Sequence, residues 1–389
     1  MSTMQVYKGL DGIYVDESSI CEIDGDRGEL YYCGINVKDL ARNGTFEETA
    51  YLLWHGRLPT QKELDAFSYR LIRNREIPKS LYKFLILFPE DASPIDFMKT
   101  AVSYMSSVDK SHEDQSIEAQ RRRSNELLAR LPLLVAAFHR SRNGHNMIES
   151  SRKLGHAANL LYIITGEKPE PEAARALDRY LILLAEHGLN ASTFSARVTS
   201  STQSDFFSGV ASALGTLKGP LHGGANEDVM KLLLKIEELE NVKPVVEDML
   251  AEGKRIPGFG HRVYKVEDPR SVALREFNEE FHSHTRGYHW YDMAKKVEEV
   301  VRSKPKFQEK NLYPNVDFYS APLLYSVGIP LDLFTPMFAV ARAAGYSAHL
   351  IEQYKNNRLI RPRESYVGPR NLPYVPIDER EEVETQPSY

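Results

Sequence analysis

The stretch IPGFGHRVY at residues 256–264 leads into Asp268, Pro269 and Arg270, and joins a glycine-rich turn to a predicted helix start. Glycine tolerates positive φ and lets a ligand approach the backbone, so the two glycines can present His261 to a ligand. Asp268 is a favourable N-cap and Pro269 a favourable first helical residue, which would place Arg270 in the first turn. The stretch predicts an imidazole and an anion-binding guanidinium in one rigid unit. A loop, a cap and a solvated arginine are the structural alternative.

A second glycine-flanked histidine lies upstream, in the stretch KGPLHGGANE at 218–227. His222 precedes an amphipathic helix predicted from about Asn226 to Leu239. The partial positive charge at a helix N-terminus disfavours imidazolium, so this ring should stay neutral and donate a hydrogen bond. A lone histidine is more often structural, but a core histidine seldom needs glycines beside it.

A carboxylate follows in YPNVDFYS at 313–320. Asp317 has the position of an N-cap for the next helix, which is its structural interpretation. Its aromatic and apolar neighbours indicate a further role, because desolvation by them would raise its pKa toward that of a useful general base.

Two more arginines stand out near the C-terminus. Arg342 lies among alanines in a long helix predicted from Thr335 to about Asn357. An arginine in so apolar a setting must pair with an anion or reach an interface. The stretch LIRPR at 359–363, with Arg361 at its centre, ends the compact body, and the Pro-bearing tail after it predicts an extended arm.

Helical patterns cover almost all of the chain after a hairpin predicted at residues 20–33. Thr45 and Thr60 each begin a capping-box sequence with Glu three residues later. A basic loop is expected at 304–310. Because no alternation of strands and helices appears, a parallel sheet is not expected. The predicted fold class is all-α with a small N-terminal β-hairpin.

Composition indicates a globular protein without a nucleic-acid or membrane partner. The 389 residues suggest two or three domains, or one large unit with a subdomain, and the net charge of −5 gives no reason to expect nucleic acid as a partner. The N-terminus has no apolar signal core, and the apolar runs are too short to span a bilayer. With Cys21 and Cys33 as the only cysteines, a reduced pair and a cytoplasmic location are expected.

A metal site is not expected from the sequence. Three histidines, His282, His284 and His289, have a spacing that could hold a metal ion. No cysteine and no well-placed carboxylate completes a ligand set around them.

Taken together, the motifs resemble those of citrate synthases, in the shorter archaeal or Gram-positive form. The resemblance covers nearly the whole chain, from KGLDGI at 8–13 to the Arg-Pro-Arg tail, and rests on GPLHGGANE, PGFGHRVYKVEDPR, YPNVDFYS and VARAAG with LIRPR. It implies a mostly helical homodimer with a large domain (1–217 and 330–389) and a smaller mobile domain (218–329). It also implies condensation of acetyl-CoA with oxaloacetate and hydrolysis of citryl-CoA, at entry to the tricarboxylic acid cycle, without metal or prosthetic group.

The resemblance also implies a role for each site residue. Asp317 would remove a proton from the acetyl methyl group, His222 would hydrogen-bond the thioester oxygen, and His261 would polarise the oxaloacetate ketone. The oxaloacetate-binding residues would be His187, Arg270, Arg342 and Arg361, the last of them entering the partner's active site. Coenzyme A would contact Ile256, Pro257, Gly258, Phe259, Gly260 and Lys265.

Some alternatives stay open from the sequence. Gly188 replaces an acidic residue that many relatives carry, which bears on how His187 is oriented. The 2-methylcitrate synthases share almost all these motifs and accept propionyl-CoA, and one added methylene in a pocket is worth only ~1–3 kcal/mol. A non-catalytic CoA-binding relative is the remaining alternative, and the presence of all three catalytic matches argues against it.

Overall fold

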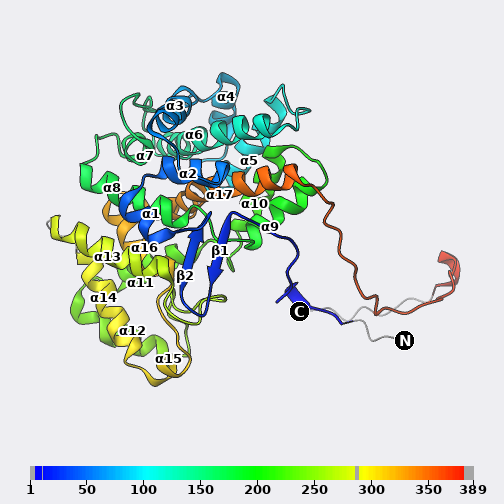
Figure 1. The fold of residues 1–389 in the computed structure, drawn as a ribbon. Coiled ribbons are helices and arrows are strands. Elements are labelled where there is room, and N and C mark those ends of the chain that lie inside the picture. The colour runs from blue at the N-terminus through cyan, green and yellow to red at the C-terminus, as the bar shows by residue number, and fades with distance from the viewer. Residues whose placement is uncertain (1–4, 11, 285–288, 381–389) are drawn as a thin grey trace. The chain divides into compact units, whose positions relative to one another are not determined.

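The computed structural model describes residues 5–10, 12–284 and 289–380, and helices dominate it (Figure 1). A three-stranded antiparallel sheet precedes the helices, with strands β1 (Cys21–Asp24), β2 (Glu29–Tyr32) and β3 (Ile35–Asn36). Cys21 pairs with Tyr32 in this sheet, and both cysteines are free thiols. The predicted all-α class with an N-terminal hairpin is confirmed, and a third short strand extends the hairpin.

The helices before His222 make up most of the larger helical layer around the core. They are α1 (Val37–Asn43), α2 (Phe46–His55), α3 (Gln61–Arg73), α4 (Lys79–Leu87), α5 (Pro94–Val108), α6 (Ile117–Arg142), α7 (His156–Thr165), α8 (Pro171–Leu184), α9 (Ala191–Ser201) and α10 (Phe206–Leu217). The capping boxes predicted at Thr45 and Thr60 are confirmed at the starts of α2 and α3.

The central helix is α17 (Phe334–Lys355), which packs against α2, α6, α8, α9 and α10 (Figure 1). Nearly all its residues from Phe334 to Ile351 are buried. Its small residues permit close backbone contacts: a Cβ on Gly345 would lie only 2.4 Å from the Ala185 carbonyl oxygen. The Gly345 amide instead donates a hydrogen bond to that oxygen at 3.1 Å. This contact ties α17 to the end of α8.

A second group of helices packs around α16 (Val316–Ser326): α11 (Ala225–Ile236), α12 (Val242–Ala251), α13 (Pro269–His284), α14 (His289–Arg302) and α15 (Pro305–Glu309). The helices α11, α13 and α14 contact α16, and α12 contacts α14. The helices α13 and α16 also contact α8. This group falls within residues 218–329, and the separate mobile domain assigned to that range stays a prediction.

Two local predictions are wrong. The loop expected at 304–310 contains the short helix α15, because Pro305 suits the first turn and Phe307 is buried. Asp317 is not the N-cap of α16: Asn315 is, and its side chain accepts a hydrogen bond from the Asp317 amide at 3.0 Å. Asp317 therefore lies inside the first turn, with its carboxylate not used as a cap.

The described residues of the terminal segments, within 5–17 and 361–380, form a unit distinct from Ser18–Ile360. In the described part of this unit, short 3-10 turns at Lys8–Leu10 and Ile377–Glu379 are the helical elements. The rest of the described tail after Arg361 is exposed and extended, as the sequence predicts. Among the described helices, none has both the length and the apolar character needed to cross a bilayer.

Candidate functional site

The glycine-rich stretch and the stretch that carries Asp317 lie side by side. The Gly260 amide donates to the Tyr313 carbonyl at 2.8 Å, and the Asn315 amide donates to the Gly258 carbonyl at 2.8 Å. Gly258 has φ of 78°, and a Cβ there would lie 2.9 Å from the Phe318 Cβ. Packing inside the protein thus explains this glycine, and the pairing brings His261 and Asp317 into one region.

His261 is held by its own loop. Its Nδ1 accepts hydrogen bonds from the amides of Val263 and Tyr264, at 3.0 and 3.2 Å. Because an amide can only donate, Nδ1 carries no proton, and the neutral ring carries its proton on Nε2. Burial and the neighbouring Arg270 lower the pKa of His261 to about 4. At neutral pH this side chain is an uncharged donor through Nε2.

Arg270 is fixed by a buried two-point ion pair with Asp268. Nε lies 3.0 Å from one carboxylate oxygen and Nη2 lies 2.8 Å from the other. Asp268 also accepts from the Arg270 amide and from the Val316 amide, so it caps α13 and joins it to α16. Burial of Asp268 opposes its charge, but Arg270 holds the pKa of this carboxyl below its usual value. The guanidinium is therefore oriented before any ligand binds.

Asp317 has the electrostatic character of a general base. The residue as a whole is half-buried, and it lies between the buried Val316 and Phe318. Burial raises the pKa of Asp317 to about 6, with Arg270 lowering it and Asp268 raising it. A carboxylate with a raised pKa is a stronger base than an exposed one and is still ionised at neutral pH.

His222 is positioned by residues of α9 and α17. Its Nε2 lies 2.8 Å from the Ser192 hydroxyl, which accepts a hydrogen bond from the Tyr346 hydroxyl at 2.8 Å and lies 2.8 Å from Asn190 Oδ1. Burial and Arg342 lower the pKa of His222 to about 4, so the ring is neutral at pH 7, as the sequence predicts. A Cβ on Gly223 would lie 2.3 Å from the Leu217 carbonyl, so this turn needs its glycine.

His187 and Tyr264 connect these groups. The His187 Nε2 lies 3.0 Å from the Tyr264 hydroxyl, and its ring meets that of His261 edge-on at 5.4 Å. Burial and Arg270 hold the pKa of His187 well below its usual value. The sequence did not single out Tyr264 as a site residue, although it lies three positions after His261 and forms part of the quoted stretch.

Arg342 is buried beside this cluster. Its Nε donates to the Leu184 carbonyl at 2.7 Å, and its guanidinium carbon lies 4.8 Å from the centre of the Phe338 ring. The described carboxylates form no ion pair with it. Arg342 is thus a buried, oriented cation without a carboxylate partner, and such a cation suits an anionic ligand.

Lys265 and Arg361 stay predicted site residues. Lys265 is exposed and forms an ion pair with Asp26 in the hairpin turn, at 2.8 Å. Arg361 belongs to the separate terminal unit. The described residues contain no group of three or more His, Cys, Asp or Glu side chains arranged for a metal ion, and the side chain of His284 lies outside the described residues.

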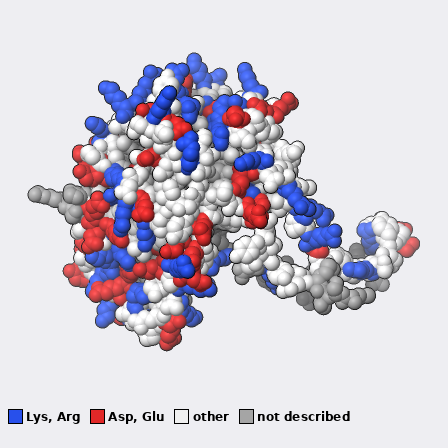
Figure 2. Space-filling view, viewed as in Figure 1, with Lys and Arg blue, Asp and Glu red and all other residues white. Residues whose placement is uncertain are grey.

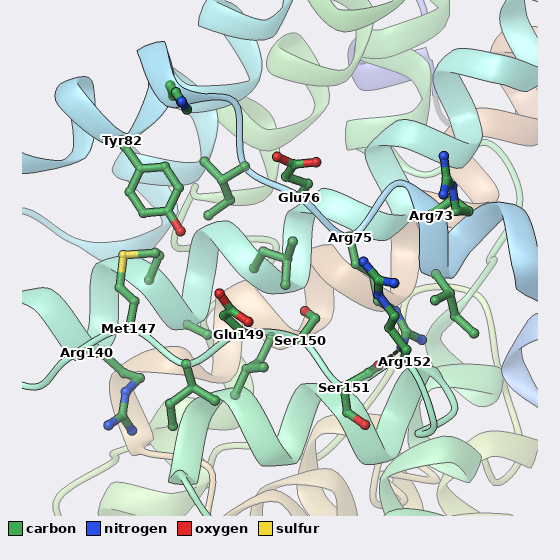
Figure 3. Close-up of a pocket in the computed structure, with 18 of the residues that line it drawn as sticks. Arg73, Arg75, Glu76, Tyr82, Arg140, Met147, Glu149, Ser150, Ser151 and Arg152 are labelled. Carbon is green, nitrogen blue, oxygen red and sulfur yellow. Dashed lines mark hydrogen bonds between the residues drawn. The ribbon is translucent and has the colours of Figure 1, made fainter.

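A cavity of about 730 Å³ lies elsewhere, between α3, α4, α6 and α7, and contains none of the predicted site residues (Figure 3). Tyr82 and Met147 lie at one end, and Arg75 and Arg152 lie at the other. Figure 2 shows Lys and Arg side chains gathered at the top of the view, over α3 and α4, with both signs mixed below.

Comparison with known proteins assigns the family. The family model for citrate synthase, C-terminal domain, matches residues 9–363. The citrate synthase of Haloferax volcanii is 46% identical, over 97% of this chain and 99% of that protein. The 2-methylcitrate synthase 1 of Corynebacterium glutamicum is 40% identical, over 98% of this chain and 100% of that protein.

The fold agrees with this assignment. The structure of citrate synthase from Thermoplasma acidophilum, in a ternary complex with carboxymethyl coenzyme A and oxaloacetate, matches with a TM-score of 0.90 and 33% identity. The match covers 97% of this chain and 100% of that one. Citrate synthases are acyltransferases that condense acetyl-CoA with oxaloacetate, and the chain belongs to the citrate synthase family.

Proposed function

We propose that this chain condenses acetyl-CoA with oxaloacetate and hydrolyses the resulting citryl-CoA, with Asp317, His222 and His261 as its catalytic residues. The observation that carries the proposal is the pairing of 258–260 with 313–315, which brings a neutral histidine donor and a basic carboxylate into one region. Carbon–carbon bond formation beside a carbonyl needs both groups: a base for the methyl proton and a donor for the ketone.

Asp317 takes the proton from the acetyl methyl group. Its pKa of about 6 leaves it ionised at neutral pH, and it has no capping hydrogen bond to break because Asn315 caps the helix. His222 donates to the thioester oxygen as negative charge develops on it. In this proposal the Ser192 hydroxyl donates to Nε2, so the neutral ring carries its proton on Nδ1, and Nδ1 is the nitrogen assigned to the substrate.

His261 polarises the oxaloacetate ketone through its Nε2 proton and gives that proton to the new alkoxide. Its pKa of about 4 matters here, because a neutral imidazole is a weak acid whose proton moves only when the alkoxide forms. The substrate carboxylates bind Arg270 and Arg342, with His187 beside them. Asp268 uses Nε and Nη2 of Arg270, so Nη1 is assigned to the substrate.

Other parts of the proposal concern the assembly and the second substrate. Coenzyme A lies along 256–260, with Lys265 serving a phosphate after release from Asp26, and residues 218–329 close over the bound substrates. The chain works as a homodimer in which Arg361 enters the partner's site, and it needs no metal or other cofactor. The cytoplasmic location predicted from the sequence stays a prediction.

Release of free CoA thiol from acetyl-CoA, measured with and without oxaloacetate, tests the proposed function. Oxaloacetate-dependent thiol release is expected, and kcat/KM should be higher with acetyl-CoA than with propionyl-CoA. A preference for propionyl-CoA would assign 2-methylcitrate synthesis instead. No release with either thioester, from a chain that still binds CoA, would indicate a non-catalytic relative.

A further inference from the structure

A row of charged and polar side chains lies buried where α9 and the segment before it pack against α17. The row is next to His187, which is assigned to the keto-acid substrate. Glu186 is 0% exposed, His349 1%, Gln353 2% and Arg197 3%. Charges buried this deeply are weak contributors to stability, because desolvation opposes their attraction. Apolar residues of similar volume would serve a purely structural purpose at least as well.

The hydrogen-bond partners determine the proton positions in this row. Arg197 Nη1 lies 3.2 Å from His349 Nδ1, and arginine can only donate, so Nδ1 must be the acceptor. The proton of the neutral His349 ring is therefore on Nε2, which lies 2.9 Å from Glu186 Oε1. Donation thus runs in one direction, from Arg197 to His349 to Glu186.

Glu186 directly precedes His187, and α17 holds this segment at three successive points. Arg342 Nε bonds the Leu184 carbonyl at 2.7 Å, the Gly345 amide bonds the Ala185 carbonyl at 3.1 Å, and His349 bonds the Glu186 side chain. Residues spaced by three or four share one face of a helix. The same face of α17 therefore carries Arg342 and positions the backbone that carries His187.

Glu186 also fits too tightly for another arrangement. A Cβ on Gly345 would lie 2.1 Å from Glu186 Oε2, and no described residue hydrogen-bonds that oxygen. A buried carboxylate oxygen without a partner is costly, so the single bond to His349 is the contact that orients this side chain.

The other end of the row reaches the chain just before Arg361. Arg197 Nε donates to Gln353 Oε1 at 2.9 Å, and Gln353 Nε2 donates to Asn357 Oδ1 at 2.9 Å. The Ile360 amide in turn donates to the Ser201 hydroxyl of α9 at 3.1 Å. Arg197 therefore bonds both to the support of His187 and, through Gln353, to Asn357 just after α17.

We propose that Glu186, His349 and Arg197 form a positioning relay, by which we mean a chain of hydrogen bonds without proton transfer. This relay fixes the positions of His187 and Arg342 relative to each other for binding of the keto-acid substrate. None of the three needs to touch the substrate. The inference rests on the proposed function, because it takes His187 and Arg342 as oxaloacetate-binding residues. Loss of the relay should weaken oxaloacetate binding and leave the thioester substrate nearly unaffected.

Two substitutions at one position test the relay. In His349→Gln the amide can still accept from Arg197 and donate to Glu186, whereas His349→Leu removes both bonds and stays apolar. We expect His349→Leu to raise the oxaloacetate KM about tenfold, with the acetyl-CoA KM within twofold of wild type. His349→Gln should restore the oxaloacetate KM to within threefold.

A matched control removes another buried histidine. His156 in α7 is 3% exposed, and its Nε2 has no hydrogen-bond partner among the described residues. His156→Leu should lower Tm at most and leave both KM values unchanged. If His349→Leu does not fold, His349→Asn replaces it, because its shorter amide cannot span both partners and should give the same rise in the oxaloacetate KM.

Calorimetric titration of each variant with oxaloacetate alone provides a readout that does not depend on turnover. A wild-type oxaloacetate Kd in a folded His349→Leu or His349→Asn variant would overturn the relay while leaving the proposed function intact. An equal rise in both KM values, or no rescue by glutamine, would also overturn it. Wild-type protein without oxaloacetate-dependent thiol release would contradict the proposed function, and the titration would still decide the relay.

Discussion

The region around Asp317 and the cavity between α3, α4, α6 and α7 both contain basic and acidic side chains, but they differ in how those side chains are held. In the first region Arg270 and Arg342 are 3% and 1% exposed, and each has a hydrogen bond that fixes its orientation. In the second, Arg73 and Arg152 are exposed, and neither has an ion-pair partner among the described residues.

The difference distinguishes the cavity, which is defined by its volume, from the region around Asp317, which is defined by charged groups that are already oriented. The cavity is large, about 730 Å³, and Arg75 in its lining is held by the Ser151 and Leu154 carbonyls, whereas Arg73 and Arg152 at its rim are exposed to solvent. Around Asp317 the cost of ordering the charged groups has been met during folding, by Asp268, by Leu184 and by the loop amides on His261. Preorganised groups of this kind stabilise a developing charge without reorganising, which is the main source of catalytic power in most enzymes.

The largest expected effect comes from removing the base. Asp317→Asn keeps the shape of the side chain and abolishes its basicity, so kcat should fall ~10²–10⁴-fold with oxaloacetate affinity nearly unchanged. Thiol release and calorimetry measure the two quantities. Asp39→Asn is the matched control, because Asp39 lies in the first turn of α1 and is exposed. Retention of more than about a tenth of kcat in Asp317→Asn would rule out the base assignment.

The next effect concerns the ion pair that orients a cation. Arg270→Lys keeps the charge but cannot bond Asp268 at two points while also reaching a carboxylate. We expect the oxaloacetate KM to rise ~10–100-fold, equivalent to ~1.4–2.8 kcal/mol. Arg275→Lys, on the same helix and paired with Glu267, should change this KM by less than about twofold. Equal effects of the two substitutions would contradict preorganisation at Arg270.

How far the sequence predicts this site depends on whether the partners are close in the chain. His261 and its donors Val263 and Tyr264 lie within four residues, so the glycine-rich stretch contains its own geometry. The bond between His187 and Tyr264 spans 77 positions, and the bond between Glu186 and His349 spans 163. The first pair depends on how the end of α8 meets the loop that carries Tyr264, and the second on how α8 and α17 pack, and no local pattern encodes either arrangement.

Helix starts, too, can be predicted only where the capping partners are close in the chain. Capping boxes at Thr45 and Thr60 were predictable because both partners lie within three residues. At 315–317, Asn and Asp are both good caps two positions apart, and propensity alone does not choose between them. Asp268, which caps α13, accepts a hydrogen bond from the Val316 amide and so helps to set where α16 begins. The tertiary contact thereby leaves Asp317 available for chemistry.

The pH dependence should follow Asp317 rather than the histidines. Its carboxyl is protonated and inactive below a pKa of about 6, so kcat/KM for acetyl-CoA should fall tenfold per pH unit below that value. His222 and His261 have pKa values of about 4 and stay neutral throughout this range. A pH–rate profile of wild type tests the sign and position. An acid limb that persists unchanged in the residual activity of Asp317→Asn would assign it to another group.

The test of the terminal arm measures recovery of activity in a mixed dimer, which differs from wild type by about a factor of two. If Arg361 enters the partner's site, an Arg361→Ala chain paired with an Asp317→Asn chain yields one doubly damaged site and one intact site. The mixed dimer should recover up to about half of wild-type activity, since identical sites each supply half. Both mutant homodimers serve as controls and should be severely impaired. No recovery in the mixed dimer would show that Arg361 acts in its own chain.

The smallest effect is expected at the cavity. Arg73→Ala and Arg152→Ala each remove an exposed cation from its rim, and exposed substitutions usually change free energies by no more than ~0.5 kcal/mol, which is about twofold. Both variants should therefore keep kcat/KM within about twofold of wild type. Arg342→Ala is the contrasting substitution, because it removes a buried cation whose Nε holds the Leu184 carbonyl. It should raise the oxaloacetate KM by at least tenfold. A tenfold loss of kcat/KM in either rim variant, with unchanged Tm, would mean that the cavity is coupled to the site and that solvated charges contribute to its chemistry.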